Sequence, residues 1–326
     1  MPLSLSAGVL MYRKDLFAEA GLDPERPPED WAELLEYARR LTVPSRNQHG
    51  LMVYGGQYLS WGSYALLVSN GGRAMQRNAE GVWSASFDSP EMAEAAAFLW
   101  RLAREPFAAD HDGGRASPGA AIVGPGTGAE LDRMWQRGQV GMTFQSFRED
   151  LVALANPELI GVAPVPKAPR GRRGAEVNAR MLGVFSGSTH AQKLAVMRFI
   201  WFMTSEEAQR IRTRIYVENG FGRFANPLWL ERYGYEEALA QVPPAIRQLY
   251  ATIFDDGVPE PYGRNTQHIY RYMSEPLLAA LESDLGGLSP PERAAYILPL
   301  LRDAADKTNA KLLGKLTDDE VTRRLW

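Results

Sequence analysis

The chain has 326 residues, enough for two domains with a sizeable buried core. Its 45% hydrophobic and 23% charged residues describe an ordinary globular protein, and its formal net charge of −3 offers no basic footprint for nucleic acid or anionic membranes. The absence of cysteine excludes disulfides, thiolate metal ligands and a cysteine nucleophile.

The opening of the chain predicts a strand, a short helix and a longer amphipathic helix. An apolar run and a helical turn fill residues 9–20, and Gly21 ends the turn because glycine tolerates positive φ. Three prolines then forbid helix until Asp30, which can cap the next helix with Glu33 as its capping-box partner. Apolar side chains recur at helical spacing on one face of residues 31–41.

The middle of the chain alternates predicted strands and helices. Predicted strands cover residues 51–54, 140–144, 160–165 and 181–185, and predicted helices cover 63–70, 90–103, 130–137, 147–155 and 190–203. Residues 105–128 predict a long surface loop or an insertion. Ser188 is the predicted cap of the helix at 190–203, and Thr204 with Glu207 predicts a capping box for the next helix.

From residue 243 onward the pattern is almost wholly helical. Strands that alternate with helices, followed by a helical tail, argue for an α/β architecture. No apolar run reaches the roughly 18 residues that a membrane helix needs.

Several stretches of sequence follow one another in a distinctive order. They are residues 10–42, FDSPEMAEAAAFLWRLA (87–103), MWQRGQVGMTFQSF (134–147), IGVAPVPKAPRG (160–171) and GVFSGSTHAQKLAVMRFIWFMTSEEAQ (183–209). Their order resembles that of the family 1 extracellular solute-binding proteins, the maltose-binding-protein-like receptors of carbohydrate ABC importers. The resemblance implies an α/β, two-lobed, periplasmic-binding-protein-like (type II) fold whose first lobe is incomplete.

The same resemblance implies a division into lobes. Residues 1–158 and 215–326 would build the second, C-terminal lobe, and residues 159–214 would be a remnant of the first, N-terminal lobe. The start, MPLSLSAGVLMY, lacks the regions of a signal peptide. The resemblance implies a signal or lipoprotein segment and most of the first lobe before the motif with which this chain begins. By that resemblance we interpret the chain as missing an N-terminal segment on the order of one hundred residues. Such a remnant would expose strand edges and the apolar face of the helix at 190–203.

A sugar site needs flat apolar faces for the ring C–H groups and a few amide or charged groups for the hydroxyls. Three loops have this composition, and the resemblance places ligand contacts on each. They hold Gln57, Tyr58 and Trp61; Gln145, Ser146 and Phe147; and Tyr262, Arg264, Asn265 and His268. Asn178 stands where many relatives have a Gly pair, and Tyr12 is placed near the hinge. Packing in the core or at the rim remains the open alternative for each residue.

By resemblance, the chain is a substrate-binding component of an ABC transporter, periplasmic or extracellular, that binds a sugar or oligosaccharide and docks on the permease. It is expected to need no cofactor and to perform no chemistry, and its four histidines lack metal-ligand spacing. Two alternatives remain. One is a truncated binding protein that pairs with a separately encoded partner, such as the missing N-terminal segment. The other is a carbohydrate-active enzyme that uses paired carboxylates.

Overall fold

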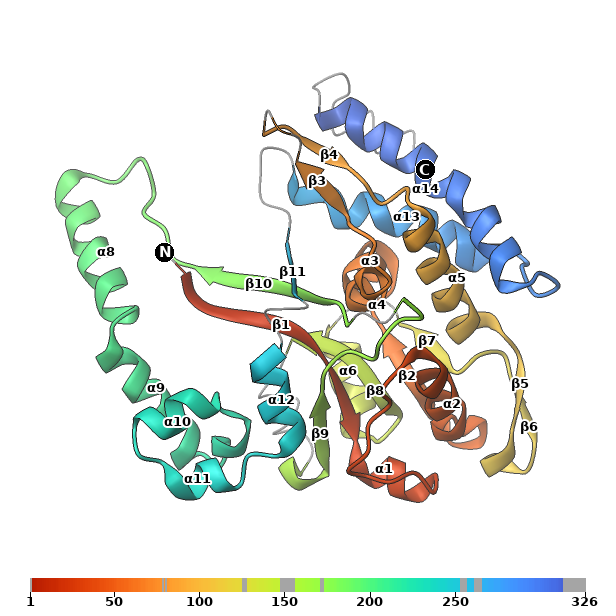
Figure 1. Ribbon diagram of the computed structural model, residues 1–326, viewed down its shortest axis with the longest axis horizontal. Coiled ribbons are helices and arrows are strands. Elements are labelled where there is room, and N and C mark those ends of the chain that lie inside the picture. Colours follow the sequence, from red (N-terminus) through yellow and green to blue (C-terminus); the bar gives the residue numbers. More distant parts are fainter. Residues whose placement is uncertain are drawn as a thin grey trace. The chain divides into compact units, whose positions relative to one another are not determined.

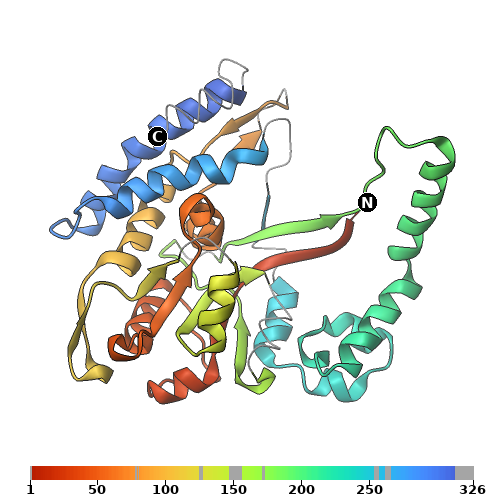
Figure 2. The same ribbon diagram turned by 180° about the vertical axis from the view of Figure 1, so that it is seen from behind.

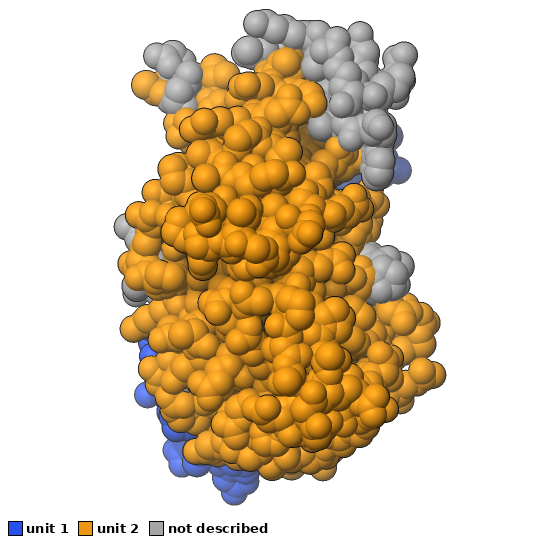
Figure 3. Space-filling view, turned by 90° about the vertical axis from the view of Figure 1, so that its right-hand side faces the viewer, with its two compact units in different colours: residues 1–7, 177–257 blue, residues 8–176, 258–326 orange. Residues whose placement is uncertain are grey.

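The computed structural model describes residues 2–77, 79, 81–124, 128–146, 156–170, 173–252, 257–260 and 266–312. Packing divides the chain into two compact units, coloured separately in Figure 3. Unit 1 comprises residues 1–7 and 177–257, and unit 2 comprises residues 8–176 and 258–326. The assignment of residues 159–214 to one lobe and of the remainder to the other stays a prediction.

A mixed sheet carries the strand order β11-β10-β1-β8-β2-β7, and β9 also pairs with β1 (Figure 1). The strands are β1 (Pro2–Arg13), β2 (His49–Val53), β7 (Ala121–Val123), β8 (Val140–Ser146), β9 (Ile160–Ala163), β10 (Ala175–Met181) and β11 (Gly257–Pro259). Strand β2 runs parallel to β7 and β8, whereas β1 is antiparallel to β8, β9 and β10. Two hairpins stand apart from this sheet: β3 (Met75–Arg77) with β4 (Trp83–Ala85), and β5 (Phe107–Ala109) with β6 (Arg115–Ser117).

The helices of unit 2 pack on one another and on the sheet. They are α1 (Lys14–Glu19), α2 (Trp31–Leu41), α3 (Leu59–Gly62), α4 (Tyr64–Ser69), α5 (Pro90–Arg104), α6 (Gly128–Gln136), α13 (Ile269–Glu282) and α14 (Pro290–Leu312). Helices α5, α13 and α14 lie side by side in Figures 1 and 2. The predicted apolar stripe of α5, which includes Leu99 and Trp100, is buried as expected.

The predicted start of the chain is confirmed except for the reciprocal bond of the capping box. Gly21 follows α1 with φ of +67°, a conformation that glycine adopts without strain. Asp30 caps α2, since its carboxylate accepts a hydrogen bond from the backbone amide of Glu33 at 2.9 Å. The Glu33 carboxylate accepts from the amide of Glu29 at 2.9 Å, one residue before the partner expected in a capping box.

The helices of unit 1 form a smaller assembly. They are α8 (His190–Met203), α9 (Glu206–Glu218), α10 (Pro227–Arg232), α11 (Glu236–Ala240) and α12 (Pro244–Thr252). Within α8 the side chain of Ile200 is buried, whereas Phe199 and Trp201 are 55% and 59% exposed. The apolar helix predicted at 190–203 is therefore present, and the chain leaves its apolar surface largely uncovered, as the sequence led us to expect.

Two predicted elements are wrong. Residues 105–128 hold β5, β6 and β7 instead of an irregular loop, because their backbone groups find partners in a hairpin and beside β2. The strand predicted at 181–185 lies earlier, at β10, because residues 177–181 pair with β1 and the more apolar run that follows does not.

Two predicted caps are also displaced by one residue. Thr189, not Ser188, caps α8, in a capping box with Gln192. Ser205, not Thr204, caps α9 through a hydrogen bond from the amide of Ala208 at 3.2 Å.

The helix predicted at 147–155 lies outside the described residues. Within the described ranges, every helix is too short or too polar to cross a membrane.

Candidate functional site

The loop after β2 places the first group of predicted ligand residues. The chain leaves β2 through Tyr54 and forms the 3₁₀ turn Gly56–Tyr58 and then α3. Gly62 allows α3 to approach closely, because a Cβ at this position would lie 2.7 Å from the backbone nitrogen of Tyr54. Trp61 is consequently held half-buried, whereas Gln57 and Tyr58 remain exposed.

Hydrogen bonds tie this loop to α13. The hydroxyl of Ser274 donates to the backbone carbonyl of Gln57 at 3.0 Å, and the Ser60 hydroxyl donates to the carbonyl of Tyr270 at 2.6 Å. The amide of Ser60 donates in turn to the Ser274 hydroxyl at 3.0 Å. These buried polar contacts fix the position of Trp61 relative to Tyr270, although the two residues are far apart in the sequence.

Gln145, from the second predicted group, reaches the same loop through Tyr54. The ring of Tyr54 lies 5.3 Å from that of Trp61, and the amide nitrogen of Gln145 donates to the Tyr54 hydroxyl at 3.0 Å. Gln145 is buried near the end of β8, and Ser146, the last residue of that strand, is half-buried. Phe147 lies outside the described residues. The structure therefore brings the first and second groups together through Gln145 and Trp61.

A buried carboxylate completes the cluster. Glu176 of β10 is 8% exposed and accepts a hydrogen bond from the Tyr270 hydroxyl at 2.8 Å. The pKa of Glu176 is raised to about 7, chiefly by burial. The neighbouring Glu260 contributes to this rise, and the hydrogen bonds from Tyr270 and Trp61 oppose it. Near neutral pH this carboxyl group is therefore a mixture of its charged and neutral forms.

Two tyrosine rings line the same carboxylate. Tyr64 and Tyr270 meet edge to face with ring centroids 5.4 Å apart. Burial, followed by the charge of Glu176, raises the pKa of both hydroxyls well above the usual tyrosine range. Both hydroxyls therefore stay protonated at physiological pH, and that of Tyr270 donates to Glu176.

The remaining predicted residues do not join the described cluster. Tyr12 is 2% exposed, packs on Phe17 with ring centroids 4.7 Å apart, and donates to the carbonyl of Pro24 at 3.1 Å. His268 lies half-buried with its ring 6.2 Å from that of Tyr272, and burial lowers its pKa. Asn178 belongs to unit 1, opposite Ser6 in the pairing of β10 with β1. Tyr262, Arg264 and Asn265 lie outside the described residues.

Sequence reasoning missed four members of this cluster: Tyr54, Tyr64, Glu176 and Tyr270. Tyr54 is the last residue of a predicted strand and precedes two glycines, which is a detectable signal. Glu176 carries no such signal, because an acidic residue beside a strand is ordinarily solvated.

The cluster offers aromatic faces, an amide and a carboxylate, which together suit a hydroxyl-rich solute. Within the described ranges, His, Asp and Glu side chains form no group that could hold a metal ion.

Several solved structures similar to this chain are solute-binding proteins, some of them described as belonging to ABC transporters. One from Thermotoga lettingae TMO, bound to alpha-D-tagatose, is 20% identical with a TM-score of 0.65; the match covers 94% of this chain and 72% of that chain. Maltose-bound MalE3 of T. maritima is 23% identical with a TM-score of 0.62, covering 93% and 72%. UgpB of Mycobacterium tuberculosis in complex with glycerophosphocholine is 18% identical with a TM-score of 0.62, covering 93% and 70%.

These matches define the class: an α/β protein with the fold of two-lobed periplasmic solute-binding proteins. The family described as bacterial extracellular solute-binding protein matches residues 1–210. The chain therefore belongs to the bacterial extracellular solute-binding proteins, and the resemblance found in the sequence motifs is confirmed. Members of this family are binding proteins and not enzymes.

A curated relative is the sn-glycerol-3-phosphate-binding periplasmic protein UgpB of Escherichia coli K12. It is 52% identical over 40 residues, which are 12% of this chain and 9% of UgpB. The match thus spans about one tenth of that relative's length.

Proposed function

We propose that this protein is the substrate-binding component of an ABC importer and that it binds a sugar or oligosaccharide. The observation that carries the proposal is the cluster in which Tyr54 contacts both Trp61 and Gln145. In the same cluster Glu176 is hydrogen-bonded to the Tyr270 hydroxyl. The indole face of Trp61 would stack on the C–H groups of a sugar ring, and the amide and carboxylate would pair its hydroxyls. The solutes bound by related structures, tagatose and maltose, support this choice of ligand class.

The same proposal covers location and partner. An extracellular or periplasmic site of action is supported by the family to which the chain belongs. The partner would be a membrane permease, to which the protein delivers solute after ligand binding has shifted its conformational equilibrium.

Calorimetric titration of the purified chain with maltose, tagatose, mannitol and glycerophosphocholine tests the proposal. We expect at least one of the first three solutes to bind, and we expect Trp61→Ala to weaken that binding about tenfold because a stacked ring is lost. Tyr296→Ala removes an exposed aromatic ring of α14 outside the cluster and should leave the affinity unchanged. Unchanged affinity in Trp61→Ala would remove this residue from the site. Failure of maltose, tagatose and mannitol, or binding of glycerophosphocholine alone, would contradict the ligand class.

The second candidate is an interaction module that pairs with a separately encoded chain. The exposed Phe199 and Trp201 of α8 favour it, since large exposed apolar surfaces often mark protein interfaces. A purified partner that protects the α8 amides from hydrogen exchange, together with no response to any solute, would place this candidate first.

A further inference from the structure

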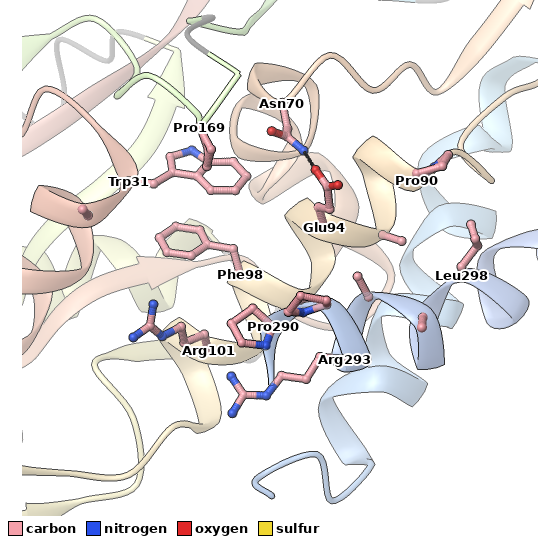
Figure 4. A pocket seen from close by; sticks show the side chains of 16 residues that line it. Trp31, Asn70, Pro90, Glu94, Phe98, Arg101, Pro169, Pro290, Arg293 and Leu298 are labelled. Carbon is pink, nitrogen blue, oxygen red and sulfur yellow. Dashed lines mark hydrogen bonds between the residues drawn. The ribbon is translucent and has the colours of Figure 1, made fainter. Parts of the chain in front are cut away.

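A groove of about 690 Å³ lies within unit 2, between the first turns of α2 and α14 and one face of α5 (Figure 4). Its volume is in the range of small-molecule binding sites. None of the residues of the Trp61 cluster lines it. The groove is therefore a second candidate site, separate from the proposed sugar site.

Aromatic rings and prolines form much of the walls of the groove. Trp31 and Phe98 stack face to face with ring centroids 4.4 Å apart and an interplanar angle of 4°. Pro169, Pro290 and Pro291 add apolar surface that loses little conformational entropy when a ligand binds. Such walls suit apolar side chains and the flat faces of peptide groups.

Two polar atoms of lining residues have no hydrogen-bond partner among the described residues. They are the indole nitrogen Nε1 of Trp31 and the amide oxygen Oδ1 of Asn70, whose residues are 5% and 0% exposed. A buried polar atom without a partner is costly, so a ligand that pairs it gains affinity. One donor and one acceptor match the C=O and N–H groups of a peptide backbone.

The α5 face of the groove carries an acidic end. Glu94 accepts from the Asn70 amide at 2.7 Å, and Glu94 and Glu91 share the single guanidinium of Arg170 at 3.0 and 3.8 Å. Two carboxylates with one cation leave an excess of negative charge among the described residues. This end favours an ammonium group.

The other end of the same helix face is basic. The guanidinium groups of Arg39, Arg101 and Arg293 all contact one carboxylate, Glu105, at 2.5, 2.8 and 3.3 Å. Although burial opposes it, the hydrogen bonds and charges of these arginines hold the pKa of Glu105 below its usual value. Three cations and one anion leave an excess of positive charge among the described residues, which favours a carboxylate.

The spacing of the two ends sets the size of the ligand. Glu94 and Arg101 both line the groove and are two helical turns apart, which is about 10 Å along α5. This distance equals the reach of roughly three extended residues. We propose that the groove binds a short zwitterionic peptide with its amino end at Glu94, its carboxylate at Arg101 and an apolar side chain against Trp31 and Phe98.

The tripeptide Ala-Phe-Ala, titrated calorimetrically into the full chain, is the probe. We expect it to bind about tenfold more tightly than the same peptide with an acetylated amino end and an amidated carboxyl end. Glu94→Gln and Arg101→Gln should each weaken binding of the free peptide and leave that of the capped peptide unchanged. Phe98→Leu should weaken both peptides, because it removes the stacked ring and keeps an apolar side chain.

Matched controls come from an exposed ion pair on α6. Glu130→Gln and Arg133→Gln change the same charges outside the groove and should leave both affinities unchanged. Thermal unfolding of each variant would identify any that fails to fold. Equal affinities for the free and capped peptides, or no binding of the free peptide to a folded wild-type chain, would overturn the proposal. Because neither probe is a sugar, this outcome is independent of the solute titrations.

Discussion

At the scale of single residues, Glu176 is the least expected feature of the protein. Its carboxyl group is buried beside Tyr270, Trp61 and Glu260, and burial is the main reason that its pKa is raised to about 7. A glutamate in the unfolded chain titrates near 4.3. The folded protein therefore binds this proton more tightly than the unfolded chain does, and folding is favoured by the neutral form.

This difference predicts how stability depends on pH. The stabilising contribution of Glu176 to the free energy of unfolding is fully present below pH about 4. It is lost as the pH rises through about 7, because the folded state then holds a buried charge. We expect the free energy of unfolding attributable to this group to fall by about 3 kcal/mol between pH 4.5 and pH 8. Urea unfolding at several pH values measures it.

Glu176→Gln isolates the effect, since glutamine keeps the hydrogen-bond acceptor for Tyr270 and does not titrate. The difference in unfolding free energy between the variant and the wild type should grow with pH in favour of the variant. A constant difference across the range would show that the carboxylate is solvated in the folded protein.

At the scale of elements, α8 shows how an apolar sequence can form a helix without being covered. Thr189 and Gln192 form a capping box at the start of α8. The first residue of the helix is therefore set by neighbouring residues and does not depend on tertiary contacts. Ile200 is its buried side chain, and the rings of Phe199 and Trp201 face outward.

This arrangement predicts unequal costs of substitution along α8. Ile200→Ala should lower the free energy of unfolding by about 2 kcal/mol, because it opens a cavity. Trp201→Ser should change it by less than about 0.5 kcal/mol, because the ring is largely exposed, and it should reduce aggregation. Urea unfolding and light scattering test the two statements. A large loss of stability in Trp201→Ser would mean that this ring is covered in solution.

At the scale of the whole molecule, the two units differ in how much they bury. The largest fully buried side chains, including Trp135, Tyr64 and Phe17, belong to unit 2. The helices of unit 1 bury fewer and smaller apolar groups, such as Ala208, Leu230 and Ala238 among the described residues. Local stability follows buried apolar contact, so the units should open at different free energies.

Native-state hydrogen exchange should therefore separate the units. We expect the amides of α8 and α9 to exchange at a lower free energy of opening than those of β8 and α5. The amides of α13 serve as an internal reference within unit 2. Exchange of all these segments at one common free energy would show that the chain unfolds as a single cooperative unit.

The sequence by itself determined the elements whose signals are local. The cap at Asp30, the glycine stop at Gly21 and the apolar stripe of α5 arise from neighbouring residues, so their helices are predictable without a partner. The family was also evident, because ordered motifs survive in the chain. The strand at β10 was misplaced because its position depends on pairing with β1, a choice that no local pattern contains.

Only the tertiary structure decided the make-up of the candidate sites. Trp61 and Gln145 were predicted as ligand contacts from their residue types in expected loops, whereas the structure places Trp61 in α3 and Gln145 in β8. Glu176 and Tyr270 meet across nearly one hundred residues of sequence. Their meeting depends on how α13 docks on the loop after β2, through Ser60 and Ser274. The groove beside Trp31 depends likewise on the packing of α5 against α14. In both candidate sites, the burial of a side chain and the charges around it depend on segments that are distant in the sequence. These properties therefore arise only when the chain folds.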